Sequence, residues 1–156
     1  MTNQKNTKNL ITKEGLEEFK KEYDELVSSK RPRVLKRVSE MRSLGDLKEN
    51  EAYHAARKQL AFIDGRIKEL EYIFKNALVS NKNKGSTAQI GSSIKLEVEG
   101  QQQKITLVGE SEGNLSQGRI SVSSPLGRAI LGKSPGTEIK VEAPGGEIIY
   151  KILEIN

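Results

Sequence analysis

The sequence predicts an α+β protein, in which an N-terminal antiparallel helical hairpin of coiled-coil type precedes a small, mostly antiparallel β-sheet domain with one short helix. Apolar residues recur at steps of three and four up to residue 74, which is the period of an amphipathic helix. Beyond a polar stretch at 81–87, short segments of alternating apolar and polar residues are separated by turn-forming residues. We therefore expect a hairpin at 1–80, a linker at 81–87 and a sheet domain at 88–156, with each half able to fold alone.

The first helix is predicted from an apolar stripe between residues 12 and 41. Its members are Leu16, Phe19, Tyr23, Leu26, Val34, Val38 and Met41. Thr12 is a candidate N-cap, although Gly15 stands where a capping box would have an acid. Pro32 lies inside the pattern and lacks a backbone N–H, so we expect a kink or a break near residues 29–31.

The second helix is predicted from a stripe whose spacings alternate between four and three, as in the seam of a coiled coil. Its members are Ala56, Leu60, Ile63, Ile67, Leu70 and Phe74. Because only the short link 43–48 separates the two helices, they are expected to run antiparallel and to cover each other's apolar seam. Gly45 supplies a left-handed residue after the first helix, and Asp46 with Glu49 three positions later matches a capping box for the second.

The second half of the chain has the period of short strands. The predicted strands lie at 93–99, 104–108, 119–123, 138–142 and 147–155. Turn signals such as Pro144-Gly145-Gly146 separate them. Residues 126–131, opened by Pro125 and closed by Gly132, predict a short helix.

The composition narrows the possible chemistry. The 156-residue chain has no Cys and one His, which argues against disulfides, thiolate metal sites and histidine-based triads. No apolar run approaches the roughly 18 to 20 residues of a membrane span, and the first nine residues are polar, so we expect a cytoplasmic protein without membrane contact. The net charge of +5 is only a weak sign of a nucleic-acid partner, because Lys and Arg are interleaved with Asp and Glu.

The predicted tip of the hairpin, at 45–51, carries two acids that admit two interpretations. Asp-x-x-Glu at the start of a helix is most often a capping box. Alternatively, Asp46 and Glu49 are hard oxygen ligands that hold Mg²⁺ and activate a water. With no third clustered acid and no His to build a full cage, such a pair would have to complete the active site of another molecule.

Several separated motifs, in a fixed order, show a resemblance to a known family. They are Gly45-Asp46-Leu47-Lys48-Glu49-Asn50, Tyr53-His54-Ala55-Ala56-Arg57, Gly65-Arg66-Ile67, the run from Ile120 to Lys133, and Ala143-Pro144-Gly145-Gly146-Glu147. From about Leu10 to Glu154 the chain resembles the GreA group of the Gre family, bacterial transcription elongation factors that promote transcript cleavage. The resemblance implies an antiparallel coiled coil and a C-terminal domain of FKBP-like shape. It also implies entry of the coiled coil into the secondary channel of bacterial RNA polymerase, where it stimulates cleavage of the nascent RNA 3′ end in backtracked complexes.

The resemblance also implies roles for individual residues. Asp46 and Glu49 match the tip acids that share Mg²⁺ with the polymerase active site, so the chain itself is expected to be neither an enzyme nor the stable holder of a cofactor. Tyr53 matches an aromatic residue that helps to orient the RNA end. The remaining matches are Arg42 and Arg57, of the basic spot that meets the RNA, and Ser124 and Pro125, of the loop that contacts the polymerase. A monomer is expected.

Other interpretations stay open at this stage. The structural alternatives are that Tyr53 only packs against the opposite helix and that Arg42 and Arg57 are ordinary solvated charges. The chain has Glu51-Ala52 where the family usually has Ala-Glu, which moves one acid about 100° around the helix. Leu44 replaces a common His. The competing functions are an inhibitory factor of the same superfamily that enters the channel without promoting cleavage, a prolyl isomerase, which the scarcity of aromatic residues disfavours, and a general basic nucleic-acid binder.

Overall fold

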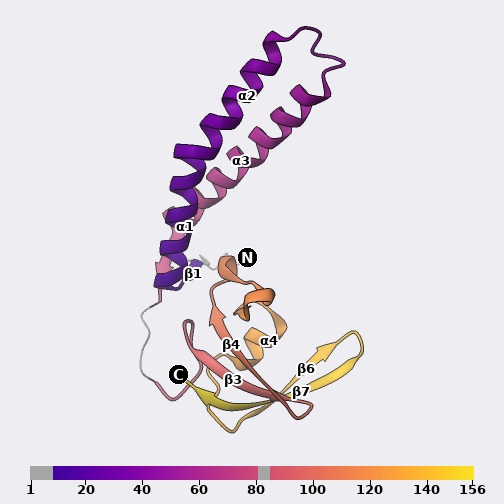
Figure 1. Cartoon of the computed structure of the whole chain (residues 1–156). Coiled ribbons are helices and arrows are strands. Elements are labelled where there is room, and N and C mark those ends of the chain that lie inside the picture. The colour runs from indigo at the N-terminus through magenta and orange to yellow at the C-terminus, as the bar shows by residue number, and fades with distance from the viewer. Residues whose placement is uncertain (1–8, 81–84) are drawn as a thin grey trace, which may run out of the picture. The chain divides into compact units, whose positions relative to one another are not determined.

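The computed structural model describes residues 9–80 and 85–156, and its elements are shown in Figure 1. The described chain forms two compact units. The hairpin unit is Leu16–Lys75, and the sheet unit comprises the other described residues, from both ends of the chain. Long helices in one unit and a β-sheet in the other confirm the predicted α+β class.

The predicted linker at 81–87 includes residues 81–84, which lie outside the described residues. The bounds 1–80 and 88–156 stay a prediction. The sheet unit additionally contains 9–15 and 76–80, which precede and follow the helical hairpin.

The hairpin has two arms (Figure 1). The first is built from α1 (Lys13–Glu25), a π-helical turn η1 (Leu26–Lys30) and α2 (Arg31–Ser43), and the second is the single helix α3 (Glu51–Asn76). The wider π turn immediately precedes the segment that holds Pro32, whose missing N–H and bulky ring do not fit the interior of an α-helix. The chain does not break at residues 29–31: it stays helical from α1 into α2, and the expected irregularity before Pro32 is this π turn.

Apolar side chains join the two arms along the predicted stripes. Every member of both stripes is buried or half-buried; those fully buried are Leu26, Val34, Ala56, Ile63 and Leu70. Each buried Leu or Ile contributes roughly 1.5–3 kcal/mol relative to an exposed one. The rings of Tyr23 and Phe74 meet edge to face, with centroids 5.6 Å apart, which pairs the start of one arm with the end of the other. The prediction of an antiparallel hairpin is confirmed.

Ion pairs across the arms fix their register. The Arg66 guanidinium donates to both carboxylate oxygens of Glu22, at 2.8 and 2.7 Å, and also contacts Glu69. The hydrogen bonds from Arg66 hold the pKa of Glu22 below its usual value. Nearer the tip, Arg31 donates to Asp64 at 2.7 Å. The bidentate pair of Arg66 and Glu22 adds directional specificity to the apolar seam.

The main sheet of the sheet unit has the strand order β5-β4-β3-β7-β6. The strands are β3 (Ser93–Val98), β4 (Gln101–Val108), β5 (Arg119–Ser121), β6 (Glu138–Ala143) and β7 (Gly146–Ile155). Only β5 runs parallel to its neighbour, so the expected mostly antiparallel sheet is confirmed. The predicted short helix is α4 (Pro125–Ile130). Its Ile130 packs into a core formed by inward-facing strand residues such as Ile94, Leu107 and Ile152.

A second, two-stranded sheet was not predicted. It pairs β1 (Asn9–Ile11) in parallel with β2 (Ala77–Val79), directly before α1 and directly after α3. Three residues per strand are too few to show a period, and the partners are far apart in the sequence. The pairing buries Ile11, which is 1% exposed.

Among the residues that the structure describes, no helix has the length and apolar character needed to cross a membrane.

Candidate functional site

The tip of the hairpin is an irregular loop, because α2 ends at Ser43 and α3 begins only at Glu51. Asn50 caps α3: its side-chain oxygen accepts the N–H of Tyr53 at 3.0 Å, while its amide donates to the carbonyl of Met41 at 3.2 Å. The predicted capping box of Asp46 and Glu49 is therefore wrong. Asn50 takes the cap because it also ties the start of α3 to the last turn of α2, a contact that the sequence spacing alone does not reveal.

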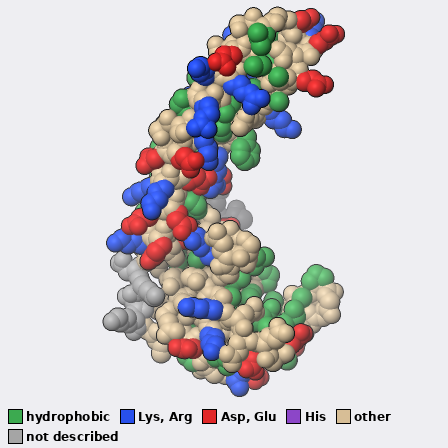
Figure 2. Space-filling model, viewed as in Figure 1, with side chains coloured by type: hydrophobic (Ala, Val, Ile, Leu, Met, Phe, Trp, Pro, Cys, Tyr) green, Lys and Arg blue, Asp and Glu red, His purple; other side chains and the backbone are tan. Residues whose placement is uncertain are grey.

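The two tip acids lie on this loop and make few contacts with the rest of the described chain. Asp46 is exposed and accepts one hydrogen bond, from the N–H of Lys48 at 3.0 Å, after Gly45 has turned the chain with a φ of 126°. Glu49 is exposed, and its side chain makes no hydrogen bond or ion pair with any other described residue. Figure 2 shows acidic side chains at the end of the hairpin, open to solvent. Both carboxylates are thus available to bind something outside the chain.

The tip does not by itself form a metal cage. Among residues 9–80 and 85–156 no group of three or more His, Asp or Glu side chains is placed to hold an ion. Within this part of the chain, Asp46 keeps one carboxylate oxygen free of hydrogen bonds and Glu49 keeps both. These are suitable hard ligands for Mg²⁺, but further ligands would have to come from another molecule.

Tyr53 and Arg57 lie together on the first turns of α3, next to the tip loop. The Arg57 guanidinium carbon is 5.9 Å from the centre of the Tyr53 ring, within the range of a cation–π contact. The ring also meets His54 edge to face, with centroids 5.6 Å apart. Both of these ring interactions of Tyr53 are with residues of its own helix. Arg42, in the last turn of α2, is exposed and without an ion pair among the described residues.

Ser124 and Pro125 belong to the sheet unit, whereas the other predicted site residues belong to the hairpin unit. Ser124 is the N-cap of α4: its hydroxyl accepts the N–H of Gly127 at 3.0 Å and donates to the carbonyl of Ser121 at 2.7 Å. Pro125 follows as the first residue of the helix and is exposed. The serine therefore has a structural role, which presents the proline on a fixed turn.

Comparison with known proteins now identifies the family. The profile described as "Transcription elongation factor, N-terminal" matches residues 9–79, and the profile described as "Transcription elongation factor, GreA/GreB, C-term" matches residues 82–156. The chain belongs to the GreA/GreB family of transcription elongation factors. The resemblance expected from the motifs is confirmed, and both family segments are present in the order in which the family has them.

The similarity between this chain and its known relatives extends over nearly the whole chain. Transcription elongation factor GreA of Thermomicrobium roseum is 40% identical over 148 residues, which cover 93% of this chain and 95% of that protein. GreA of Rhodospirillum rubrum is 42% identical over 146 residues, covering 91% and 93%. The crystal structure of GreA factor homolog 1 of Thermus thermophilus is 25% identical, covers 95% of this chain and 98% of its own, and has a TM-score of 0.45.

Proposed function

We propose that this elongation factor stimulates the intrinsic cleavage of nascent RNA by bacterial RNA polymerase in backtracked complexes. Its family membership and its GreA relatives support a role in elongation. The observation that carries the cleavage function is the tip loop, where Asn50 takes over the capping of α3 and leaves Asp46 and Glu49 exposed. Acids needed only for the fold would make hydrogen bonds or ion pairs within it.

The form of the hairpin unit suits delivery of these acids into a narrow passage. The 26 residues of α3 extend for about 39 Å at 1.5 Å per residue. Two packed helices, each about 10–12 Å across, make a rod that passes where a globular domain does not. We propose that this rod enters the secondary channel of the polymerase, so that the acids act in trans and the chain needs no active site of its own.

At the polymerase active site, Asp46 and Glu49 would serve as ligands for a Mg²⁺ ion that the enzyme also holds. When bound, the ion supplies polarisation of a coordinated water and stabilisation of the negative charge that develops on the phosphate. The hydrogen bond from Lys48 orients the Asp46 carboxylate and leaves one of its oxygens available. Glu49 has no partner among the residues that the structure describes, so none of these contacts has to be given up on docking.

The neighbouring residues would position the RNA. Tyr53 offers a ring on which a base can stack, and Arg57 and Arg42 bring positive charge near the phosphates of the extruded 3′ end. The contact between Arg57 and the Tyr53 ring keeps the two side chains together. In the sheet unit, the exposed Pro125 on the Ser124 turn is proposed to contact the polymerase. The factor acts as a monomer in the cytoplasm.

A direct test is RNA cleavage by the host polymerase in a complex stalled after backtracking. Adding the protein should shorten the RNA from its 3′ end at least ten-fold faster than polymerase alone, in a reaction that requires Mg²⁺. No acceleration would contradict the proposal. Slower cleavage than with polymerase alone would instead identify the chain as an inhibitory factor of the same superfamily.

A further inference from the structure

One buried carboxylate in the sheet unit takes no part in the proposed cleavage chemistry. Glu112, at the end of the 3₁₀ turn η2 (Glu110–Glu112), is 5% exposed. Its Oε2 accepts the N–H of Thr12 at 2.8 Å and the N–H of Gly109 at 3.1 Å, and its Oε1 accepts the hydroxyl of Thr12. Both oxygens are engaged, and 100 positions of sequence separate Glu112 from Thr12.

These contacts complete a capping box whose acid comes from a remote part of the chain. Thr12 caps α1, because its hydroxyl oxygen accepts the N–H of Gly15 at 3.0 Å. In an ordinary capping box the residue at the position of Gly15 is Glu or Gln, and its side chain accepts the N–H of the cap residue. Here Glu112 accepts that N–H. Its negative charge also lies at the favourable, N-terminal end of the α1 dipole.

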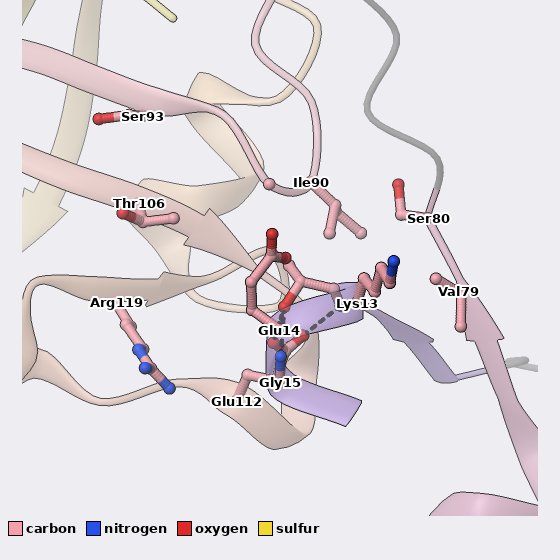
Figure 3. Close-up of a pocket in the computed structure, with 12 residues that line it drawn as sticks. Lys13, Glu14, Gly15, Val79, Ser80, Ile90, Ser93, Thr106, Glu112 and Arg119 are labelled. Carbon is pink, nitrogen blue, oxygen red and sulfur yellow. Dashed lines mark hydrogen bonds between the residues drawn. The ribbon is translucent and has the colours of Figure 1, made fainter. Parts of the chain in front are cut away.

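Two glycines make room for this contact. A Cβ on Gly15 would overlap Oε1 of Glu112, and a Cβ on Gly109 would overlap the carbonyl oxygen of Leu10. Gly15 is buried in the first turn of α1, where glycine is a poor helix former. Figure 3 shows Gly15 and Glu112 next to each other beside a cavity of about 460 Å³, with the hydrogen bonds as dashed lines. The unfavourable residue choice is explained by the space that Glu112 needs.

The segment that Glu112 holds, residues 9–15, is here called the strap. Besides the contacts of Thr12, two interactions fix the strap. They are the pairing of β1 with β2 and the hydrogen bond from the N–H of Ser80 to the carbonyl of Ile11 at 2.8 Å. The strap belongs to the sheet unit, and α1 runs from it without interruption into the hairpin unit at Leu16. The second helical arm, α3, re-enters the sheet unit at Asn76. The described chain thus passes between the units through both helices.

We propose that Glu112 is a latch that holds the strap in the sheet unit, so that the hairpin is attached through both of its helices. Because this attachment places the tip acids, Glu112 is also a positioning residue for cleavage. The cleavage part of this inference rests on the proposed function. An open latch leaves the hairpin attached only through the chain that follows α3, because β2, among the described strands, pairs only with β1 of the strap itself. The sheet unit then still presents the loop of Ser124 and Pro125, but the tip acids reach the polymerase active site less often.

The test compares the same substitution at two helical glycines of the full-length chain. Gly15→Ala places a methyl group against Glu112, whereas Gly65→Ala, within α3, meets no atom within 4 Å. Helix propensity alone predicts that both changes strengthen their helices. The latch predicts the opposite at residue 15: hydrogen exchange of the amides of residues 12–15 should be on the order of ten-fold faster in Gly15→Ala and unchanged in Gly65→Ala.

Variants of Glu112 show whether the overlap with its side chain is the cause. Glu112→Ala alone should open the strap, and Gly15→Ala added to it should have no further effect, since the overlap is gone. Glu112→Gln keeps one oxygen for the two N–H donors and should give an intermediate exchange rate. Unchanged exchange at residues 12–15 in both Gly15→Ala and Glu112→Ala would overturn the latch.

The same variants test the positioning role. At saturating protein, Gly15→Ala should slow stimulated cleavage about ten-fold, while its competition with wild type for polymerase stays within about two-fold. Faster strap exchange with wild-type cleavage would overturn the positioning role and leave the proposed function intact. Failure of the wild-type protein to stimulate cleavage would instead overturn the proposed function, and the exchange result would still decide whether the latch exists.

Discussion

Two glutamates of this chain have opposite surroundings. Glu112 is buried, and each of its oxygens is engaged by donors from the strap or from Gly109. Glu49 is exposed on an irregular loop and has no partner among the described residues. A carboxylate with both oxygens engaged within the fold is held in one geometry and has little left to offer a ligand. One without partners keeps its full capacity to bind a cation from outside.

The same contrast separates the two regions in which these residues lie. Around Glu112 the backbone is fitted closely, with Gly15 and Gly109 where a side chain would collide. At the tip, the side chain of Asn50 ties the loop to both helices with two hydrogen bonds, and the tip acids stay exposed. Changes near Glu112 should therefore act first on the stability of the strap and on cleavage only through it, whereas changes at the tip should act directly on cleavage and leave stability almost unaltered.

The largest effect is expected at the tip. Glu49→Gln should lower stimulated cleavage on the order of 100-fold, because a neutral amide is a poor ligand for Mg²⁺. Thermal unfolding should be unchanged, since Glu49 makes no hydrogen bond or ion pair within 9–80 and 85–156 that could be lost. Glu51→Gln, the same chemical change on the first residue of α3, is the control and should retain cleavage within a few-fold. Equal loss in both variants would mean that the tip needs negative charge and no particular ligand.

The next effect should appear at the latch. Thr12→Val removes the hydroxyl that caps Gly15 and that donates to Glu112. Losing a helix cap and leaving a buried carboxylate oxygen unpaired should cost about 2 kcal/mol of the unfolding free energy of the sheet unit. Native-state hydrogen exchange at amides of the main sheet measures this quantity. Thr12→Ser keeps the hydroxyl and should cost far less; similar losses in both would show that the methyl group matters and the hydrogen bonds do not.

A smaller effect on activity is expected from the basic side chain beside Tyr53. Arg57→Glu replaces an attraction for RNA phosphates by a repulsion and removes the cation–π contact, so cleavage at limiting protein should fall about ten-fold. Lys58→Glu reverses an exposed charge one position along the same helix, away from this pair. It should have a clearly smaller effect. An equal loss would show that only the overall charge of the hairpin matters.

The smallest effect concerns the register of the hairpin. Glu22→Gln weakens the bidentate pair with Arg66, which is partly exposed, so the loss at neutral pH should be about 0.5–1 kcal/mol. Hydrogen bonds from Arg66 lower the pKa of Glu22 from 4.5, so the stabilisation is complete above that pH and disappears as the pH falls through the lower value of the folded state. Denaturant unfolding of both proteins from pH 7 downward should show the difference shrinking below pH 4.5. A difference independent of pH would contradict the ionic origin.

The parts of the fold that repeat a local period could be predicted from the sequence. The helical stripes and the strands of the main sheet follow from spacings of three, four and two, which the structure confirms. The irregularity before Pro32 follows from the proline itself, and it is a π turn in a continuous helix. The cap of α3 could not be decided in this way. Asp46 and Asn50 both stand three residues before a suitable N–H, and Asn50 takes the role because of its contact with Met41 on the other arm.

Contacts between segments that are distant in the sequence produce no periodic pattern by which they could be predicted. The Thr12 cap without an acid at residue 15 was visible in the sequence, but nothing near Glu112 indicates that it supplies the missing acid. The pairing of β1 with β2 is equally hidden, because each strand has only three residues. The positions of the tip acids, by contrast, follow from the hairpin itself once its two stripes are recognised. The roles of these acids in cleavage stay a prediction.

The most direct test of the central claim, that the tip acids act on the chemistry, is Asp46→Asn. The side-chain oxygen of Asn can still accept the N–H of Lys48, so the loop should be retained, whereas its amide is a poor ligand for Mg²⁺. The measurement is the single-turnover rate of RNA cleavage in a backtracked complex of the host polymerase at fixed Mg²⁺, together with competition against wild type for binding. We predict a fall in cleavage on the order of 100-fold, partly restored by raised Mg²⁺, with binding unchanged. Full cleavage by Asp46→Asn at ordinary Mg²⁺ would contradict the account.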